Sequence, residues 1–284
     1  SPDYLGNQAD LAAAAEICRR RGTILTVDNA HGAYLRFLNP SRHPLDLGAA
    51  VCCDSAHKTL PVLTGGAYLH IGKDAPASFA ESARASMELF GSTSPSYLTL
   101  ASLDLCSRYL AEGYAGRLAA AAEELAELRG HLSASGWQVE PSDPLRLTLR
   151  MPAGLTGQDL AQRLRREGVE CEYADRDFLV LMASPENSLQ DRARLLSALG
   201  ANTAPPSREA PLSPAGGERA ASIRQALMAP RERVPVDRAL GRVCGAPTVS
   251  CPPAVPIAVS GERIGPAEMA LFARYGVTEV EVLL

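Results

Sequence analysis

The stretch Val27-Asp28-Asn29-Ala30-His31-Gly32 stands at the end of a short apolar run, and Asp54-Ser55-Ala56-His57-Lys58-Thr59 stands at the end of a second one. Apolar, β-branched runs of this kind predict strands, here Thr23–Val27 and Ala49–Cys53. The functional groups of α/β sheets gather at the carboxyl ends of strands. Asp28 and Lys58, thirty positions apart (58 minus 28), are therefore expected at one edge of a sheet.

The residues around these runs predict an α/β fold. An alanine-rich helix is expected at about Gln8–Arg21, a third strand at Gly66–Ile71, and helices from Ala75 to about Ser135, one of which Pro95 could open. Strands that alternate with helices are typical of a sheet covered by helices. Residues 1–135 are therefore expected to form one domain.

After Gly136 the pattern changes to shorter elements. The sequence predicts a helix at about Thr156–Arg166 and strands at Trp137–Glu140, Leu145–Met151, Val169–Tyr173 and Phe178–Met182. Residues 136–200 are therefore expected to form a small α+β domain. Residues 201–217 are rich in Pro, Ala and Gly without periodicity, which is typical of a linker. Residues 218–284 are then a C-terminal module, with a helix near its start and a strand near its end.

The composition indicates a globular protein, with 46% hydrophobic and 21% charged residues. The net charge of -4 comes from 28 basic and 32 acidic residues that are well mixed, which argues against nucleic acid as a partner. No apolar run reaches the roughly 18 residues of a membrane span, and the N-terminus lacks a basic segment followed by an apolar one. We therefore expect a cytoplasmic protein that does not bind membranes.

The seven cysteines form no CxxC pair, and their odd number cannot be paired within one chain. Reduced thiols are the simpler interpretation. The adjacent Cys52 and Cys53 would point to opposite faces of a strand and could not chelate one metal together. Since the histidines also show no metal-ligand spacing, no metal site is expected.

A carboxylate and a lysine at one sheet edge are what pyridoxal phosphate (PLP) chemistry requires. The lysine forms a Schiff base with the cofactor aldehyde, and the carboxylate keeps the pyridine nitrogen protonated. Ser55 and His57, close to Lys58, suit the phosphate as hydrogen-bond donors. The plainer alternatives are that Lys58 is a solvated surface residue and that Asp28 caps a helix or a turn.

These motifs, with Thr64-Gly65-Gly66, resemble the PLP site of the bacterial ornithine/lysine/arginine decarboxylase family, which has the aspartate-aminotransferase fold (fold type I). Later segments fit the same family in the same order, namely Ser92-Thr93-Ser94-Pro95-Ser96-Tyr97, Ala239-Leu240-Gly241-Arg242-Val243, Cys251-Pro252-Pro253-Ala254-Val255-Pro256 and Ser260-Gly261-Glu262-Arg263-Ile264. The resemblance implies part of a fold type I large domain with a mostly parallel sheet, a small α+β domain and a C-terminal decarboxylase module.

The resemblance also implies roles for single residues. Lys58 would hold the cofactor aldehyde, Asp28 would pair with the pyridinium nitrogen, and Ala30 would lie against the ring. The phosphate would be bound by Ser55 and His57.

Three further residues have two interpretations each. His31 would contact the cofactor or the substrate carboxylate, or it would only make a structural hydrogen bond. Ser92 and Thr93 would reach the phosphate of a neighbouring subunit in a homodimer or higher homo-oligomer, or they would only cap a helix.

The sequence departs from the family pattern at a few positions. Asn29 stands where the family has an acidic residue, and Ala254 and Val255 replace the glycine and isoleucine of its late proline-rich motif. The family's phosphate loop and the residue that stacks on the ring lie upstream of Ser1. We therefore expect the chain to be N-terminally incomplete and to bind PLP poorly on its own.

The activity that the resemblance implies is α-decarboxylation of arginine, lysine or ornithine to an amine of polyamine biosynthesis. Two alternatives stay open. One is another fold type I enzyme, an aminotransferase or a lyase, since the same Asp and Lys serve all of them. The other is a non-catalytic homologue that lacks the N-terminal half.

Overall fold

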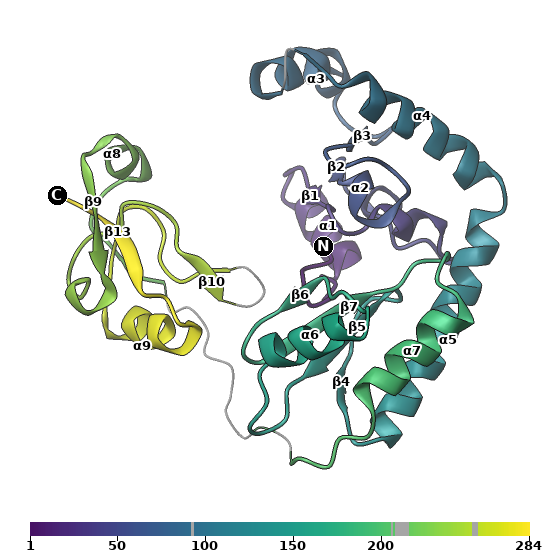
Figure 1. Cartoon of the computed structure of the whole chain (residues 1–284). Helices are drawn as coiled ribbons and strands as arrows, with labels where there is room; N and C mark the ends of the chain where they lie inside the picture. Colours follow the sequence, from purple (N-terminus) through teal and green to yellow (C-terminus); the bar gives the residue numbers. More distant parts are fainter. Residues whose placement is uncertain (92–93, 206, 208–215, 252–254) are drawn as a thin grey trace. The chain divides into compact units, whose positions relative to one another are not determined.

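The computed structural model describes residues 1–91, 94–205, 207, 216–251 and 255–284, with the side chains of 249–251 left aside. The chain divides into two compact units (Figure 1). The first unit comprises Ser1–Ala134, Glu140–Thr148 and Met182–Leu196. The second comprises Ser135–Val139, Leu149–Leu181 and Ser197–Leu284.

A three-stranded sheet of order β1-β2-β3 is the centre of the first unit, built from β1 (Thr26–Asp28), β2 (Val51–Asp54) and β3 (Tyr68–Ile71). The first two strands are parallel, and their register places Asp28 opposite Cys53. The prediction that the first two apolar runs are strands that end at one edge of a sheet is confirmed.

The third strand differs from the mostly parallel sheet that we expected, because β3 runs antiparallel to β2. Between the two strands, residues 55–67 contain only the four-residue helix α2 (Ala56–Thr59). A parallel connection needs a crossover that usually includes a full helix. The chain therefore returns along β2 in the opposite direction.

The predicted helices of the first unit are present as α1 (Leu11–Arg20), α3 (Ala77–Phe90), α4 (Tyr97–Ala111) and α5 (Tyr114–Ala134). Gly113, with φ +78°, separates α4 from α5, since this left-handed conformation favours glycine. Two short 3-10 helices, η1 (Ala33–Phe37) and η2 (Pro44–Leu47), follow β1. The core joins η1, α2 and α5 through Tyr34, Leu35, Ala56 and Leu118, which are almost completely buried.

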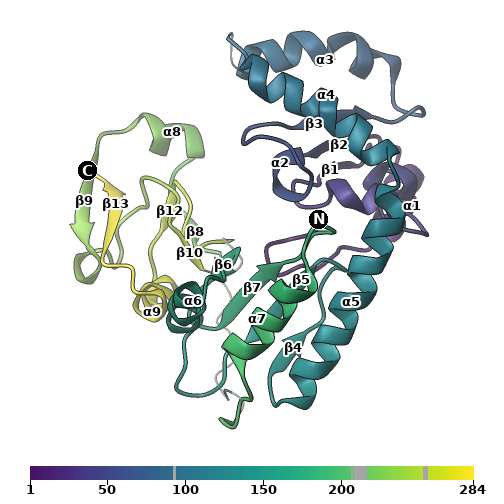
Figure 2. The same cartoon turned by 45° about the vertical axis from the view of Figure 1, so that its right-hand side comes forward.

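A second sheet has four strands in the order β4-β5-β7-β6, namely β4 (Gln138–Glu140), β5 (Arg146–Arg150), β7 (Phe178–Met182) and β6 (Tyr173–Ala174). Helix α6 (Gly157–Arg166) begins at Thr156, whose hydroxyl accepts a hydrogen bond from the backbone N–H of Asp159. Figure 2 shows α7 (Leu189–Leu199) alongside α5, where Arg192 and Glu124 form an ion pair. Strands β4, β5 and β7 and helix α6 agree with the sequence prediction. Strand β6 overlaps the expected strand Val169–Tyr173 only at Tyr173, and α7 was not predicted.

The last part of the chain contains α8 (Ile223–Met228), η3 (Val236–Arg238), α9 (Pro266–Tyr275) and the short strands β8 (Glu218–Arg219), β9 (Arg231–Pro235), β10 (Val249–Cys251), β11 (Val255–Pro256), β12 (Glu262–Arg263) and β13 (Glu279–Leu283). Strands β9 and β13 pair antiparallel, with Val234 opposite Val280. These two valines pack with Phe272 in one apolar core. Most of the predicted linker, residues 201–217, lies outside the described residues.

Among the described residues, none of the helices combines the length and the apolar character needed to cross a lipid bilayer.

Candidate functional site

Asp28 is the last residue of β1, and its side chain is exposed at the edge of the sheet. Its Oδ1 accepts a hydrogen bond of 3.0 Å from the backbone N–H of Ala30. Aspartate side chains often stabilise a turn by accepting a hydrogen bond from the backbone N–H two residues later. The turn holds the Asp28 carboxylate at the strand end, with Ala30 two residues further along the chain.

Lys58 lies on α2, the one-turn helix that follows β2. The helix is fixed by Ala56, which is fully buried, and by the bond of 3.0 Å from the Lys58 N–H to the carbonyl of Ser55. The Lys58 side chain reaches His31, whose Nε2 lies 3.1 Å from Nζ. Its ammonium also lies over the ring of Tyr4, 5.6 Å from the centroid.

His31 is buried beside these groups, with the ring of Tyr4 edge-on at a centroid distance of 4.8 Å. Burial, followed by the positive charges of Arg146 and Lys58, lowers the pKa of His31 to about 3, while the charge of Asp28 opposes this shift. The imidazole is therefore neutral.

A neutral His31 accepts at Nε2 from the Lys58 ammonium, so we assign its ring proton to Nδ1. Within the described part of the chain, this buried Nδ1 has no hydrogen-bond partner. Since a buried donor without an acceptor is costly, a cofactor or substrate oxygen placed there would satisfy it.

The residues expected to bind the phosphate are placed around α2. Ser55 stands at the start of this helix, and its hydroxyl makes no capping bond to it. His57 Nδ1 lies 3.0 Å from the carbonyl of Gly66 and donates to it, which leaves Nε2 for another group. Ser92 and Thr93 lie outside the described residues.

Asn29 is buried and belongs to a different group of contacts from its neighbours in the motif. Its Nδ2 donates to Oδ1 of Asp54 over 2.7 Å. A carboxylate at position 29 would bring two anions together at this distance, so the amide here fits the aspartate at position 54. The hydrogen bond to Asp54 thus explains why an amide, rather than the acidic residue of the family pattern, fits at position 29.

Tyr4 and Arg146 were not identified from the sequence. Tyr4 lies in the N-terminal turn and contacts His31 and Lys58 through its ring. Arg146 begins β5 and is almost completely buried, and its charge acts on His31. No sequence spacing connects either residue with the Asp28 motif, because both come from separate segments that meet only in the fold.

The arrangement suits PLP chemistry on three observations. An amine and a carboxylate, Lys58 and Asp28, both act on the same buried imidazole. The His31 Nδ1 is a buried polar atom without a described partner. Ala30, two residues after the end of β1, carries only a methyl group and is half-buried.

A model of the family described as Orn/Lys/Arg decarboxylase, major domain, matches residues 1–150. Among curated proteins, an arginine decarboxylase of Bacillus subtilis (strain 168) is 27% identical over 287 residues, which cover 93% of this chain and 58% of that protein. The uncharacterized protein YaaO of the same organism is 28% identical over 288 residues, with the same coverage. The chain thus spans 58% of the length of these relatives.

Solved structures show the same kind of fold. A lysine decarboxylase of Francisella novicida superimposes with a TM-score of 0.70 at 15% identity, over 92% of this chain and 53% of that one. An alanine–glyoxylate aminotransferase from Nostoc sp. gives a TM-score of 0.52 at 19% identity, over 68% and 57%. This similarity agrees with the expected α/β fold of type I, although the sheet of the first unit is not the mostly parallel one that we expected.

Proposed function

Since this chain belongs to the Orn/Lys/Arg decarboxylase family, we propose that it forms the PLP site of a lyase that removes the α-carboxylate of a basic amino acid as CO2. The observation that supports this best is the contact of 3.1 Å between Lys58 and His31 at the strand edge that carries Asp28. When bound, PLP supplies an electron sink for the pair left at the α-carbon.

Lys58 is the residue that would bind the cofactor aldehyde. The chain has only two lysines, Lys58 and Lys73. His31 accepts from Lys58 and therefore holds it in one orientation. After CO2 has left, the same amine can move a proton and release the product.

Asp28 would pair with the ring nitrogen of the cofactor. An exposed carboxylate at the end of β1 is available to a bound ring, and its bond from Ala30 fixes its position. The anion would keep the ring nitrogen positively charged, which favours the electron flow that decarboxylation needs.

The phosphate would be bound by the Ser55 hydroxyl and by His57. Because His57 Nδ1 donates to the Gly66 carbonyl, its Nε2 can donate to a phosphate oxygen only when the imidazole is protonated.

A second subunit would complete the site. Ser92 and Thr93, which the resemblance assigns to the phosphate of a neighbouring subunit, are flanked by the exposed side chains of Phe90 (92%) and Tyr97 (86%). Burial of such aromatic side chains is a main source of stability in subunit interfaces. A homodimer, or a higher homo-oligomer, is therefore part of the proposal, and light scattering on the purified protein tests it.

The substrate would be arginine, lysine or ornithine. The purified protein is supplied with PLP at saturating concentration, because weak binding of the cofactor is expected, and is assayed for CO2 and for the amine with each of the three. We expect CO2 and amine in equal amounts from at least one of them, loss of both in Lys58→Ala, and retention in Lys73→Ala.

Two outcomes would contradict this function. Keto-acid formation without CO2 would indicate an aminotransferase of the same fold. If a folded protein released neither CO2 nor amine from any of the three amino acids, with or without PLP, the chain would be a non-catalytic homologue.

A further inference from the structure

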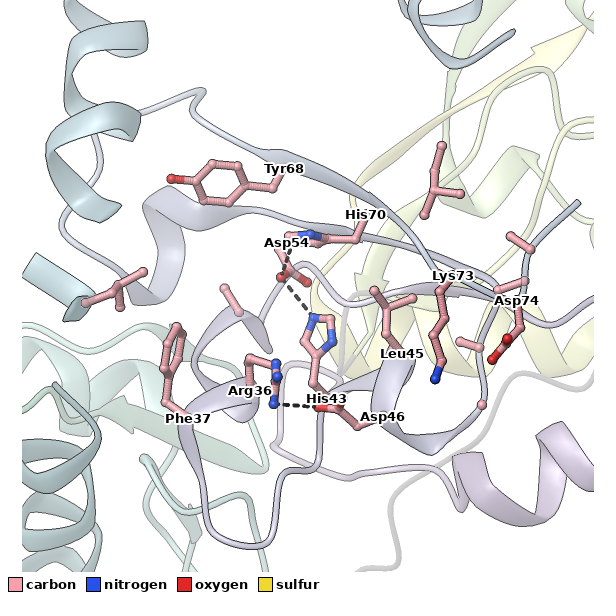
Figure 3. A pocket seen from close by; sticks show the side chains of 18 of the residues that line it. Arg36, Phe37, His43, Leu45, Asp46, Asp54, Tyr68, His70, Lys73 and Asp74 are labelled. Atoms are coloured by element: carbon pink, nitrogen blue, oxygen red, sulfur yellow. Dashed lines mark hydrogen bonds and ion pairs between the residues drawn. The ribbon is translucent and has the colours of Figure 1, made fainter. Parts of the chain in front are cut away.

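Asp54, the last residue of β2, contacts two histidines through its carboxylate (Figure 3). Its Oδ2 lies 3.2 Å from Nε2 of His43 and 3.0 Å from Nε2 of His70. The Sγ of Cys52 lies 3.7 Å from the same Nε2 of His43. Nitrogen, sulfur and oxygen atoms that bind metals thus converge at one position.

The fold brings these side chains together from three segments. Cys52 and Asp54 are two positions apart on β2, so they share one face of the strand. His70 pairs with Cys52 across the β2–β3 ladder and lies on that same face. His43 precedes η2 and closes the group from a loop.

The carboxylate at the centre of this cluster is buried. The His43 and Asp54 side chains are each only 4% exposed. His43, His70 and Asn29 all lie within hydrogen-bond distance of the Asp54 carboxylate. Within the described residues, the only ion-pair partners of this carboxylate are the two imidazoles.

Hydrogen bonds alone do not satisfy every contact in the group. The His43 Nε2 lies within reach of both the Asp54 oxygen and the Cys52 sulfur. This nitrogen carries at most one proton, so it can donate to only one of them. A cation between the three atoms would bind all of them at once.

We propose that His43 Nε2, Cys52 Sγ and Asp54 Oδ2 bind one divalent transition-metal ion, with Zn²⁺ as the best match. The three ligand atoms lie within 4.8 Å of one another. Tetrahedral Zn²⁺ bonds of about 2.0–2.3 Å place two ligand atoms roughly 3.3–3.6 Å apart. The separations of 3.2 Å and 3.7 Å from His43 are close to these values.

The fourth coordination position faces a pocket of about 470 Å³ in the first unit (Figure 3). His43, Asp54 and His70 line this pocket, whereas Cys52 does not. A water molecule or a small ligand can therefore reach the ion from the pocket. His70 holds Asp54 from that side and is a positioning residue rather than one of the three ligands.

The metal site is also linked to the Asp28 edge. Asn29 donates to Oδ1 of Asp54, the oxygen that the ion leaves free. An ion that fixes Asp54 therefore also fixes Asn29, the residue directly after Asp28. Metal binding itself does not depend on the proposed decarboxylation.

Cobalt absorption gives the most direct test. A chelator first removes bound metal from the purified protein, which is then titrated with Co²⁺. The visible and near-ultraviolet spectrum of bound Co²⁺ reports thiolate ligation and tetrahedral geometry. Zn²⁺ is then added in competition. We expect one equivalent of Co²⁺ per chain, a thiolate charge-transfer band, and displacement by Zn²⁺. Cys52→Ser should remove the band and weaken metal binding by at least about tenfold.

Cys53→Ser is the matched control, because Cys53 is the next residue on β2 and points to the opposite face. This variant should keep the band and the affinity. Should Cys52→Ser fail to fold, Cys52→Ala provides a second variant without the thiol, and the wild-type spectrum remains decisive. Absence of stoichiometric Co²⁺ binding, a bound ion without a thiolate band, or an unchanged band in either Cys52 variant would overturn the proposal.

Discussion

Lys58 and His31 contact each other through Nζ and Nε2 at 3.1 Å, although 27 positions separate them in the chain. Burial and neighbouring positive charges lower the pKa of His31 to about 3, so the imidazole is the acceptor in this contact. The contact joins the end of β1 to α2. It thereby makes one site out of the two motifs that the sequence shows separately.

Replacement of His31 tests whether this residue acts in the reaction or only packs. We expect His31→Gln to keep the visible absorption of bound PLP and to lower kcat by about 10²-fold, since an oriented Lys58 is lost. Steady-state decarboxylation kinetics and absorption spectra measure the two effects. His131→Gln, at an exposed position on α5, is the control. A His31→Gln variant with wild-type kcat would assign His31 a structural role only.

Asp28→Asn should lower kcat by roughly 10²–10³-fold, because a neutral amide no longer stabilises the positive charge on the ring nitrogen. The protein should remain folded, since the Asp28 side chain is exposed. The measurement is kcat at saturating PLP, with Asp74→Asn as a control at another exposed aspartate. If both variants kept full activity, the cofactor role of Asp28 would be wrong.

The stability of the first unit should depend on pH through His31. The pKa of His31 falls from 6.5 to about 3 on folding. Between these values the unfolded chain binds a proton on His31 that the folded chain does not, so the free energy of unfolding decreases as the pH falls. The contribution of neutral His31 to the free energy of unfolding is complete above pH 6.5 and is lost as the pH falls towards 3.

Urea unfolding at several pH values checks this sign. His31→Asn should show a shallower decrease in the unfolding free energy across this range, while His131→Asn should keep the wild-type slope. Parallel curves for the wild type and His31→Asn would contradict the assignment.

A buried ion pair, Arg146–Asp143, stabilises the segment before β5, and the Tyr34 hydroxyl donates to the same carboxylate. Removal of one partner leaves an unpaired buried charge, so Asp143→Asn should destabilise the protein by about 3–5 kcal/mol. Denaturant unfolding measures this loss. Glu170→Gln, which breaks the exposed pair with Arg165, should leave the unfolding midpoint almost unchanged. Equal effects of the two substitutions would contradict this account.

The sequence predicted β1, β2 and the sheet edge at which both strands end, because local signals were sufficient there. Apolar, β-branched runs gave β1 and β2, and the polar residues after them gave Asp28 and Lys58. The direction of β3 was not predictable, since it depends on how residues 55–67 pack rather than on their composition. Helices α7 and α9 were also missed.

The His43–Asp54 cluster shows a different limit. Its side chains come from a loop and two strands, and no spacing rule connects position 43 with position 54. A partial signal was present, because Cys52 and Asp54 alternate on one strand and must share a face. The histidines that complete the group are recognisable only once the fold brings them there.

Reductive trapping of the cofactor tests the central claim most directly. The purified protein is incubated with PLP and reduced with borohydride, which fixes the cofactor to the amine that holds it, and the labelled peptide is identified by mass spectrometry. With only two lysines in the chain, the result is unambiguous. We predict the label on Lys58, whereas a label on Lys73, or no labelled lysine in protein that retains PLP, would contradict the account.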